Sequence, residues 1–256
     1  SYEQRGNTIG FKTPSYDRAR TLVIDPAPSL TWGTYYGGTG TEGGWPNHGL
    51  AVDGSGFLYV HIRTESSTGL ATAGVHQTVA NGGADALLVK FNNAGGRVWS
   101  TYYGGTGQDE VSGMTTDNSN NVFLYGMTWT ETNMGIATTG AYQEFCGPCM
   151  MGMPMTYLAK FLGSNGTRSW GTYYANAEPT IAASDGIVTD AGGNIYVSND
   201  YQVAKFNPVG TAIIWEYNFA IDGVTAITDM KLSAGGNAVV TGITLSTMGI
   251  ATAGAY

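Results

Sequence analysis

The chain has 256 residues and a net charge of −8 at pH 7, and its 11 lysine and arginine residues do not cluster. This balance argues against nucleic acid and anionic membrane surfaces as partners, and no apolar run of about 18 residues predicts membrane insertion. Charged residues make up only 12%, whereas glycine (39), tyrosine (16) and phenylalanine (8) are frequent, so short strands and tight turns, and hence an all-β protein, are expected.

Residues 1–29 differ in sequence from everything that follows. Residues 21–25 (Thr-Leu-Val-Ile-Asp) predict a strand that Pro26 and Pro28 end. The first residues, Ser-Tyr-Glu-Gln-Arg, have neither the basic start nor the apolar stretch of a signal peptide. We therefore expect residues 1–29 to be the tail of a preceding domain plus a linker, in a chain that begins within a longer protein.

From residue 30 onward the sequence is a tandem array marked by the motif Trp-x-Thr-Tyr-Tyr. The motif stands at residues 32–36, 99–103 and 170–174, and it returns in altered form at 215–219. Before each later copy the same order recurs: a strand and a Gly- or Asn-rich turn, a second strand, a loop, and a third strand containing Lys-Phe. Four short strands in about 45 residues match one β-propeller blade, and the longer repeats carry an insertion of roughly 20 residues between strands two and three.

The predicted architecture is an incomplete array of β-propeller-type tandem repeats over residues 30–256, with four-stranded antiparallel blades of about 45–70 residues. The expected units are a lone fourth strand at 30–36, blades at about 48–103, 111–174 and 182–218, and a partial blade at 224–256. Open blade edges favour association. We therefore expect either an array that continues beyond this sequence, which we favour, or copies that cover one another's edges.

Four motifs recur along the array: Trp-x-Thr-Tyr-Tyr-Gly-Gly-Thr-Gly, Ala-Val-Asp-x-x-Gly-x-x-Tyr-Val, Ala-Thr-x-Gly-Ala-Tyr-Gln and Leu-Val-Lys-Phe-Asn. Together they resemble the bacterial β-propeller repeat (SBBP, seven-bladed propeller repeat) family over residues 30–256. Residues 9–26 resemble the end of a domain that often precedes such arrays. The resemblance implies a bacterial protein that is extracellular or on the cell surface, in many relatives exported by type IX secretion. It implies no catalytic residues.

Candidate chemistry gathers in the long loop of the second repeat. Cys146 and Cys149 form a Cys-Gly-Pro-Cys motif, but a loop does not lower a thiol pKa as a helix N-terminus does. A local disulfide, or two free thiols in a surface insertion, is therefore expected. Met151 and Met153 could join the cysteines in a soft copper(I) site, which stays the alternative to apolar packing or a partner contact.

Acidic residues recur at the turn after the first strand of each blade, namely Asp53, Asp117 and Asp190. They do not fit the EF-hand pattern, and Ser233 takes the same slot in the last repeat, so a local turn role is expected. Lysine recurs on the third strands, at positions 90, 160 and 205. These lysines could pair with the turn acids or line a shared surface, but strand alternation favours an outward position that keeps the sheet soluble.

The remaining candidates are histidines and tryptophans. The histidines all lie in the first repeat and are His48, His61 and His76. His76 falls in the slot that Tyr142 holds in the second repeat, so packing is expected rather than a metal site. Trp45 and Trp129 stand outside the repeated slots, and we expect them to form an exposed contact.

Four acids follow the Tyr-Tyr motifs: Glu42, Asp109, Glu110 and Glu178. Their spacing does not show that they converge as catalytic carboxylates must, so we expect no enzyme and no cofactor. The predicted function is a non-catalytic extracellular structural or interaction module, for scaffolding, adhesion or self-assembly. Its expected partners are other copies, neighbouring surface proteins or glycans. A carbohydrate-binding or carbohydrate-active propeller is the alternative, and a copper-binding loop at Cys146–Met155 ranks last.

Overall fold

The computed structural model describes residues 2–5, 8–11, 30–43, 48–131, 135–176, 186–199, 201–219 and 225–244. The chain divides into two compact units, Ser1–Gly33 and Thr34–Tyr256. The first unit contains an antiparallel hairpin of β1 (Tyr2–Arg5) and β2 (Thr8–Phe11). The strand predicted at residues 21–25 lies outside the described residues.

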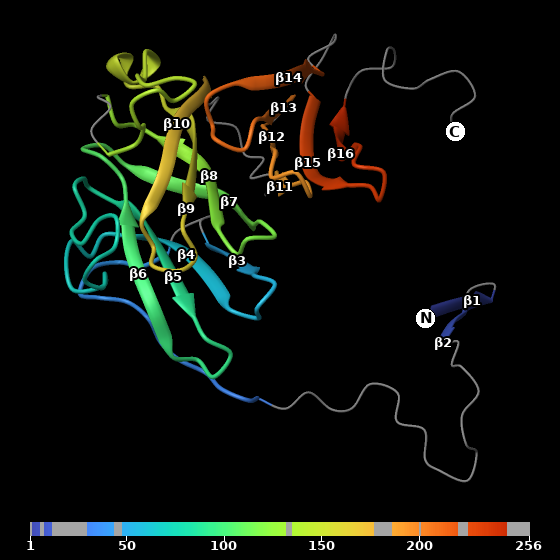
Figure 1. Cartoon of the computed structure of the whole chain (residues 1–256), viewed down its shortest axis with the longest axis horizontal. Helices are drawn as coiled ribbons and strands as arrows, with labels where there is room; N and C mark the ends of the chain where they lie inside the picture. The colour runs from blue at the N-terminus through green and yellow to red at the C-terminus, as the bar shows by residue number, and fades with distance from the viewer. Residues whose placement is uncertain are drawn as a thin grey trace. The chain divides into compact units, whose positions relative to one another are not determined.

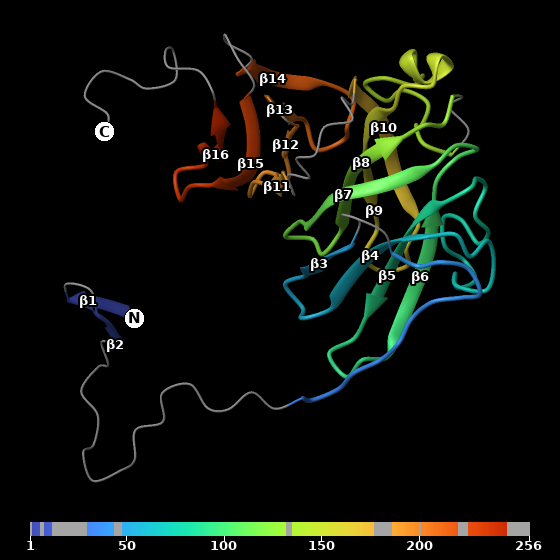
Figure 2. The ribbon, with the colours of Figure 1, turned by 180° about the vertical axis from the view of Figure 1, so that it is seen from behind.

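Within its described residues, the second unit consists of three four-stranded antiparallel sheets and a two-stranded hairpin (Figures 1 and 2). The first sheet contains β3 (His48–Val52), β4 (Leu58–Thr64), β5 (Asp85–Phe91) and β6 (Arg97–Tyr103). The second contains β7 (Asp109–Thr116), β8 (Val122–Thr128), β9 (Met155–Phe161) and β10 (Arg168–Asn176). The third contains β11 (Ile187–Thr189), β12 (Ile195–Ser198), β13 (Gln202–Phe206) and β14 (Ile213–Asn218), and the hairpin pairs β15 (Thr225–Leu232) with β16 (Ala238–Thr244).

In every sheet each strand pairs with the next one along the chain, which is the strand order of a propeller blade. The predicted fold class, all-β with four-stranded antiparallel blades in an incomplete array, is confirmed. Helical structure in the described residues is confined to the 3-10 turn η1 (Pro148–Met151). No helix in that part of the chain has the length and apolar character that a membrane span requires.

The first strands of successive sheets lie next to one another: β3 contacts β7, β7 contacts β11, and β11 contacts β15. The hydroxyl of Thr116 donates a hydrogen bond to the carbonyl of Val52 at 3.1 Å, and the hydroxyl of Thr189 donates to the carbonyl of Thr116 at 3.0 Å. The same bond therefore joins equivalent positions of consecutive blades. Stacking through the inner strands is the arrangement of a propeller.

The tryptophans of the repeated motif pack between blades. Trp99 and Trp170 are buried, and each indole lies against a turn glycine of the following blade, Gly166 and Gly210 respectively. A Cβ atom would come within 2.7 Å of the Trp99 ring at Gly166 and within 2.5 Å of the Trp170 ring at Gly210. Both glycines also have positive φ, so only glycine suits these turns. Trp215, in the same slot of β14, is 40% exposed.

The second tyrosine of the motif meets a third-strand phenylalanine of the following blade edge-on. The pairs are Tyr36–Phe91, Tyr103–Phe161 and Tyr174–Phe206, with ring centroids 5.7, 5.2 and 5.1 Å apart. Residues 30–36, predicted as a lone fourth strand, form no strand. A fourth strand needs the third strand of its own blade as a partner, and the described residues pair none with this segment. Tyr36 still keeps the packing position of the motif.

Candidate functional site

Each complete blade contains an ion pair between a turn acid and a third-strand lysine. The pairs are Asp53–Lys90 (3.3 Å), Asp117–Lys160 (3.1 Å) and Asp190–Lys205 (3.1 Å). The outward position predicted for these lysines is therefore wrong. In each blade the lysine lies opposite an aromatic residue of the second strand, and its ammonium group lies over that ring on the face that also holds the turn acid.

The turn acids also order their own turns, as the sequence predicted. Asp117 accepts hydrogen bonds from the backbone N–H groups of Ser119 and Asn121, each at 2.9 Å. The other two turn acids accept the equivalent pair of bonds, and Ser233 accepts one in the partial blade. With the lysine ammonium against each carboxylate, these acids stabilise the blade.

His76 packs among aromatic rings, with centroids 5.8 Å from Tyr103 and 6.0 Å from Phe161. Burial, together with the charge of Arg168, lowers the pKa of His76 to about 4, so the ring is neutral at pH 7. Nowhere in the described residues do three or more histidine, cysteine, aspartate or glutamate side chains gather as metal ligands. His76 therefore has the packing role that its slot in the repeat indicates.

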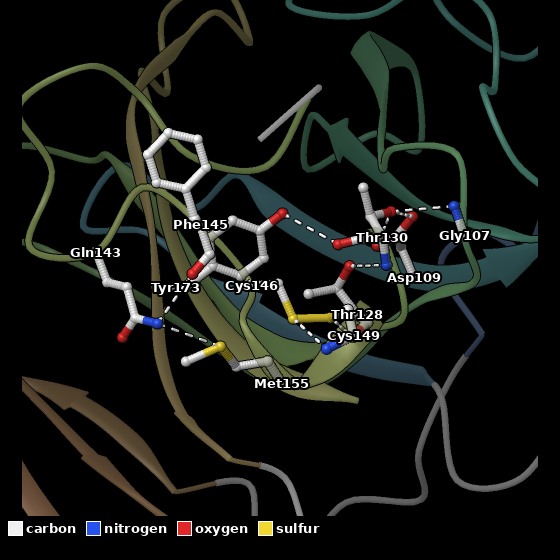
Figure 3. Close-up of a disulfide and its surroundings, with 10 residues drawn as sticks. All are labelled: Gly107, Asp109, Thr128, Thr130, Gln143, Phe145, Cys146, Cys149, Met155 and Tyr173. Atoms are coloured by element: carbon white, nitrogen blue, oxygen red, sulfur yellow. Dashed lines mark hydrogen bonds between the residues drawn. A yellow bond between two sulfur atoms is a disulfide. The ribbon is translucent and has the colours of Figure 1, made fainter. Parts of the chain in front are cut away.

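A disulfide between Cys146 and Cys149 holds the insertion between β8 and β9 (Figure 3). The sequence indicated a surface position, but both cysteines are buried in a core cluster that includes Ile136, Met155 and Tyr173. The backbone N–H of Cys149 donates to the sulfur of Cys146 at 3.1 Å. Because the two sulfur atoms are bonded to each other, neither is the thiolate that copper(I) binding or thiol exchange requires.

The most exposed large apolar side chains of the described part of this insertion are Phe145, Met151 and Met153, at 64%, 73% and 51% exposure. We call these three residues the Phe–Met loop. The side-chain amide of Gln143 fixes its base by donating to the carbonyl of Phe145 at 2.9 Å and to the sulfur of Met155 at 3.5 Å (Figure 3). Exposed apolar side chains on a braced loop are suited to a protein contact.

The two tryptophans expected to form an exposed contact have different outcomes. Trp129 follows β8 and is only partly exposed, with its backbone N–H bonded to the carbonyl of Gln108 at 2.9 Å. Trp45 lies outside the described residues. The structure therefore offers no fully exposed indole at the described position.

Three of the acids that follow the Tyr-Tyr motifs, Glu42, Asp109 and Glu110, lie among the described residues. Glu42 and Asp109 hold equivalent positions at successive blade boundaries, where each accepts a hydrogen bond from the backbone N–H four residues earlier, at 3.0 and 2.8 Å. Glu110 lies 3.6 Å from the guanidinium of Arg63. Glu178 lies outside the described residues.

Asp109 instead has a neighbour that motif spacing missed, Asp85 at the start of β5. Both side chains are fully buried, and a Cβ atom at Gly104 would lie 2.7 Å from an oxygen of each carboxylate. Burial raises the pKa of Asp85 to about 6 and that of Asp109 to about 7. Comparison of the repeats could have identified the pair, because Met155 holds the position of Asp85 in the second blade. A carboxylate at this position therefore occurs in the first blade and not in the second.

Residues 98–131 match the family model described as "Beta-propeller repeat" (SBBP). The match runs from β6, the fourth strand of the first sheet, through β7 and β8 of the second. One sequence repeat therefore spans the boundary between two blades, and the predicted resemblance is confirmed. No curated protein matches the chain.

Proposed function

We propose that this array of β-propeller repeats is a non-catalytic structural and interaction module that acts outside the bacterial cell or on its surface. The observation that carries the proposal is the Phe–Met loop, which presents Phe145, Met151 and Met153 to solvent on an insertion braced by a disulfide. Apolar side chains on a preordered loop bind a protein partner at a low cost in conformational entropy. The partner we favour is another copy of the chain or a neighbouring surface protein.

Two further features support a non-catalytic role outside the cell. The recurring acids and lysines of the blades neutralise one another, so they are committed to the scaffold. The disulfide Cys146–Cys149 is a bond that persists in oxidising compartments and is rare in the cytosol.

The carbohydrate alternative has less support. It requires an exposed aromatic platform beside accessible carboxylates, as sugar-binding and glycoside-cleaving sites have. Trp129 is only partly exposed, and the close carboxyl pair formed by Asp85 and Asp109 is fully buried.

The test is a triple variant, F145S/M151S/M153S, compared with wild type by sedimentation velocity and by binding to the isolated outer surface of the source bacterium. We expect at least a tenfold loss of affinity in the assay that detects association, because exposed aromatic and methionine side chains carry most of such an interface.

The matched control is V79S. Val79 is 46% exposed and holds the Phe145 slot in the equivalent loop of the first blade, so its loss removes apolar surface without touching the Phe–Met loop. Unchanged association in the triple variant, or an equal loss in the control, would rule out this loop as the contact. Resistance of the native protein to protease added to intact cells would contradict surface exposure.

A further inference from the structure

Asp85 and Asp109 form a buried acidic pair without a cationic partner. In the described residues no lysine, arginine or histidine makes an ion pair with either carboxylate, whereas each turn acid has its own lysine. Asp109 accepts hydrogen bonds from Gly105 and Thr130, and Asp85 accepts from Asn81 at 2.8 Å. These neutral donors leave two negative charges buried side by side, a costly arrangement unless a proton or a cation neutralises them.

Several oxygen atoms gather near the two carboxylates. The two carboxylates approach Gly104 closely, because a Cβ atom there would lie 2.7 Å from both Asp85 Oδ1 and Asp109 Oδ2. A Cβ atom at Gly82 would lie 1.9 Å from the carbonyl oxygen of Gly107, 2.9 Å from that of Gly105 and 3.1 Å from Asp85 Oδ1. These three oxygens therefore lie close together. Carboxylate and carbonyl oxygens thus lie close to Asp85 Oδ1.

Two buried oxygens in this part of the core have no hydrogen-bond partner within the described residues. One is Asp85 Oδ1 and the other is the hydroxyl of Tyr157, whose side chain is fully buried. Burial raises the pKa of Tyr157, and the neighbouring groups Tyr103, Asp109, Glu110 and Asp85 raise it further. Unpaired buried oxygens of this kind call for a bound ion or water.

The second blade shows that the scaffold does not need the acid. Its equivalent of Asp85 is Met155, which is also buried and also faces a glutamine amide, at 3.5 Å from Gln143. In the first blade Gln77 contacts Asp85 in the same way, at 3.4 Å. A thioether thus fills the slot without a buried charge, so the carboxylate at the first boundary has a purpose other than packing.

We propose that Asp85 and Asp109 bind one calcium ion at the boundary between the first and second blades, with the carbonyl groups of Gly105 and Gly107 as further oxygen ligands. Calcium fits because every donor is a hard oxygen, because two carboxylates balance its charge, and because it accepts backbone carbonyls in irregular geometry. The ion would join β5 of one blade to the loop that opens the next.

The test is calcium binding by the full chain after removal of metal with EDTA. Isothermal titration at pH 7.5 is expected to give one calcium ion per chain, and saturating calcium is expected to raise the unfolding midpoint by roughly 5 °C or more. The variant D85M, which copies the second blade, is expected to lose both effects. It is also expected to unfold at a higher temperature than metal-free wild type, because it removes a buried charge.

The control is E42Q, since Glu42 holds the Asp109 slot at the preceding boundary but is partly exposed and has no counterpart of Asp85 beside it in the described residues. This variant is expected to keep full calcium binding. Calcium binding that persists in D85M would overturn the proposal. An unfolding midpoint of wild type that does not change with calcium would also overturn it. In the latter case a shared proton neutralises the pair, and wild type loses more stability than D85M as pH rises to about 7, because the folded-state pKa values of Asp85 and Asp109 are raised.

Discussion

At the turn after each first strand an aspartate meets a lysine, whereas at the first blade boundary two aspartates meet each other. The charge of the group beside each carboxylate therefore depends on which residue the neighbouring strand places there. Asp53 and Lys90 are both buried, and the ammonium also donates to the carbonyl of Gly163 in the next blade at 2.8 Å. One lysine thus supports a turn in its own blade and a contact with the following one.

Removing that lysine leaves Asp53 buried and unpaired. We expect K90M to lower the free energy of unfolding by about 3–5 kcal/mol, since breaking a buried ion pair costs far more than the pair contributes over an apolar replacement. Urea unfolding of the purified chain measures this value.

The partial blade suggests the compensating change, because Ser233 replaces the turn acid there and still accepts a turn hydrogen bond. We therefore expect D53S/K90M to be more stable than K90M alone. A double variant that is less stable than K90M would show that the lysine acts through its contact with Gly163 and not through the acid.

At the scale of the element, the alternation of apolar and polar residues along each strand, together with the turn residues, was enough to predict the four-stranded blade. Each blade has its own turns and its own apolar faces. The sheet formed by Val122–Thr128 and Met155–Phe161 follows directly from that pattern. What the pattern could not predict is set by partners distant in sequence. Residues 30–36 have strand composition, but among the described residues no third strand pairs with them. The lysines turn inward because a turn acid from another strand attracts them.

The site shows the same limit. The apolar residues of the Phe–Met loop and the cysteines were visible in the sequence, but their burial was not, since neighbouring residues of one loop face opposite ways. Cys146 is buried while Phe145 next to it is exposed. Asp85 was missed because it lies outside the Tyr-Tyr motif, and only the folded boundary brings it to Asp109.

The disulfide is expected to stabilise the insertion locally. We expect C146A/C149A to cost about 2 kcal/mol of unfolding free energy, because the covalent loop is very short and its closure entropy is small. Limited proteolysis should detect new cleavage between Gln143 and Met155 before any cut in β8 or β9. Cleavage that begins in the strands of the second blade would show instead that the bond supports the whole sheet.

At the scale of the whole second unit, stability is distributed over repeated boundaries. Every boundary between complete blades uses the same elements: a threonine bond between inner strands, a tyrosine against a phenylalanine, and a tryptophan against a turn glycine. In such arrays each repeat is stabilised mainly by its neighbours, so unfolding of adjacent blades is coupled through these contacts.

That coupling can be tested at the boundary between the first two blades with G166A. A Cβ atom there would lie 2.7 Å from the Trp99 ring, and the residue has a φ of +72°. The control G56A has a φ of +82° with open space around the position, so it carries only the backbone penalty of about 1–2 kcal/mol. We expect G166A to cost a further 1–3 kcal/mol or so through overpacking.

Its tryptophan fluorescence should then change at lower urea than its circular dichroism, because the first blade separates from the second before the sheets unfold. Equal costs in the two variants, with coincident transitions, would mean that the indole–glycine contact does not couple the blades.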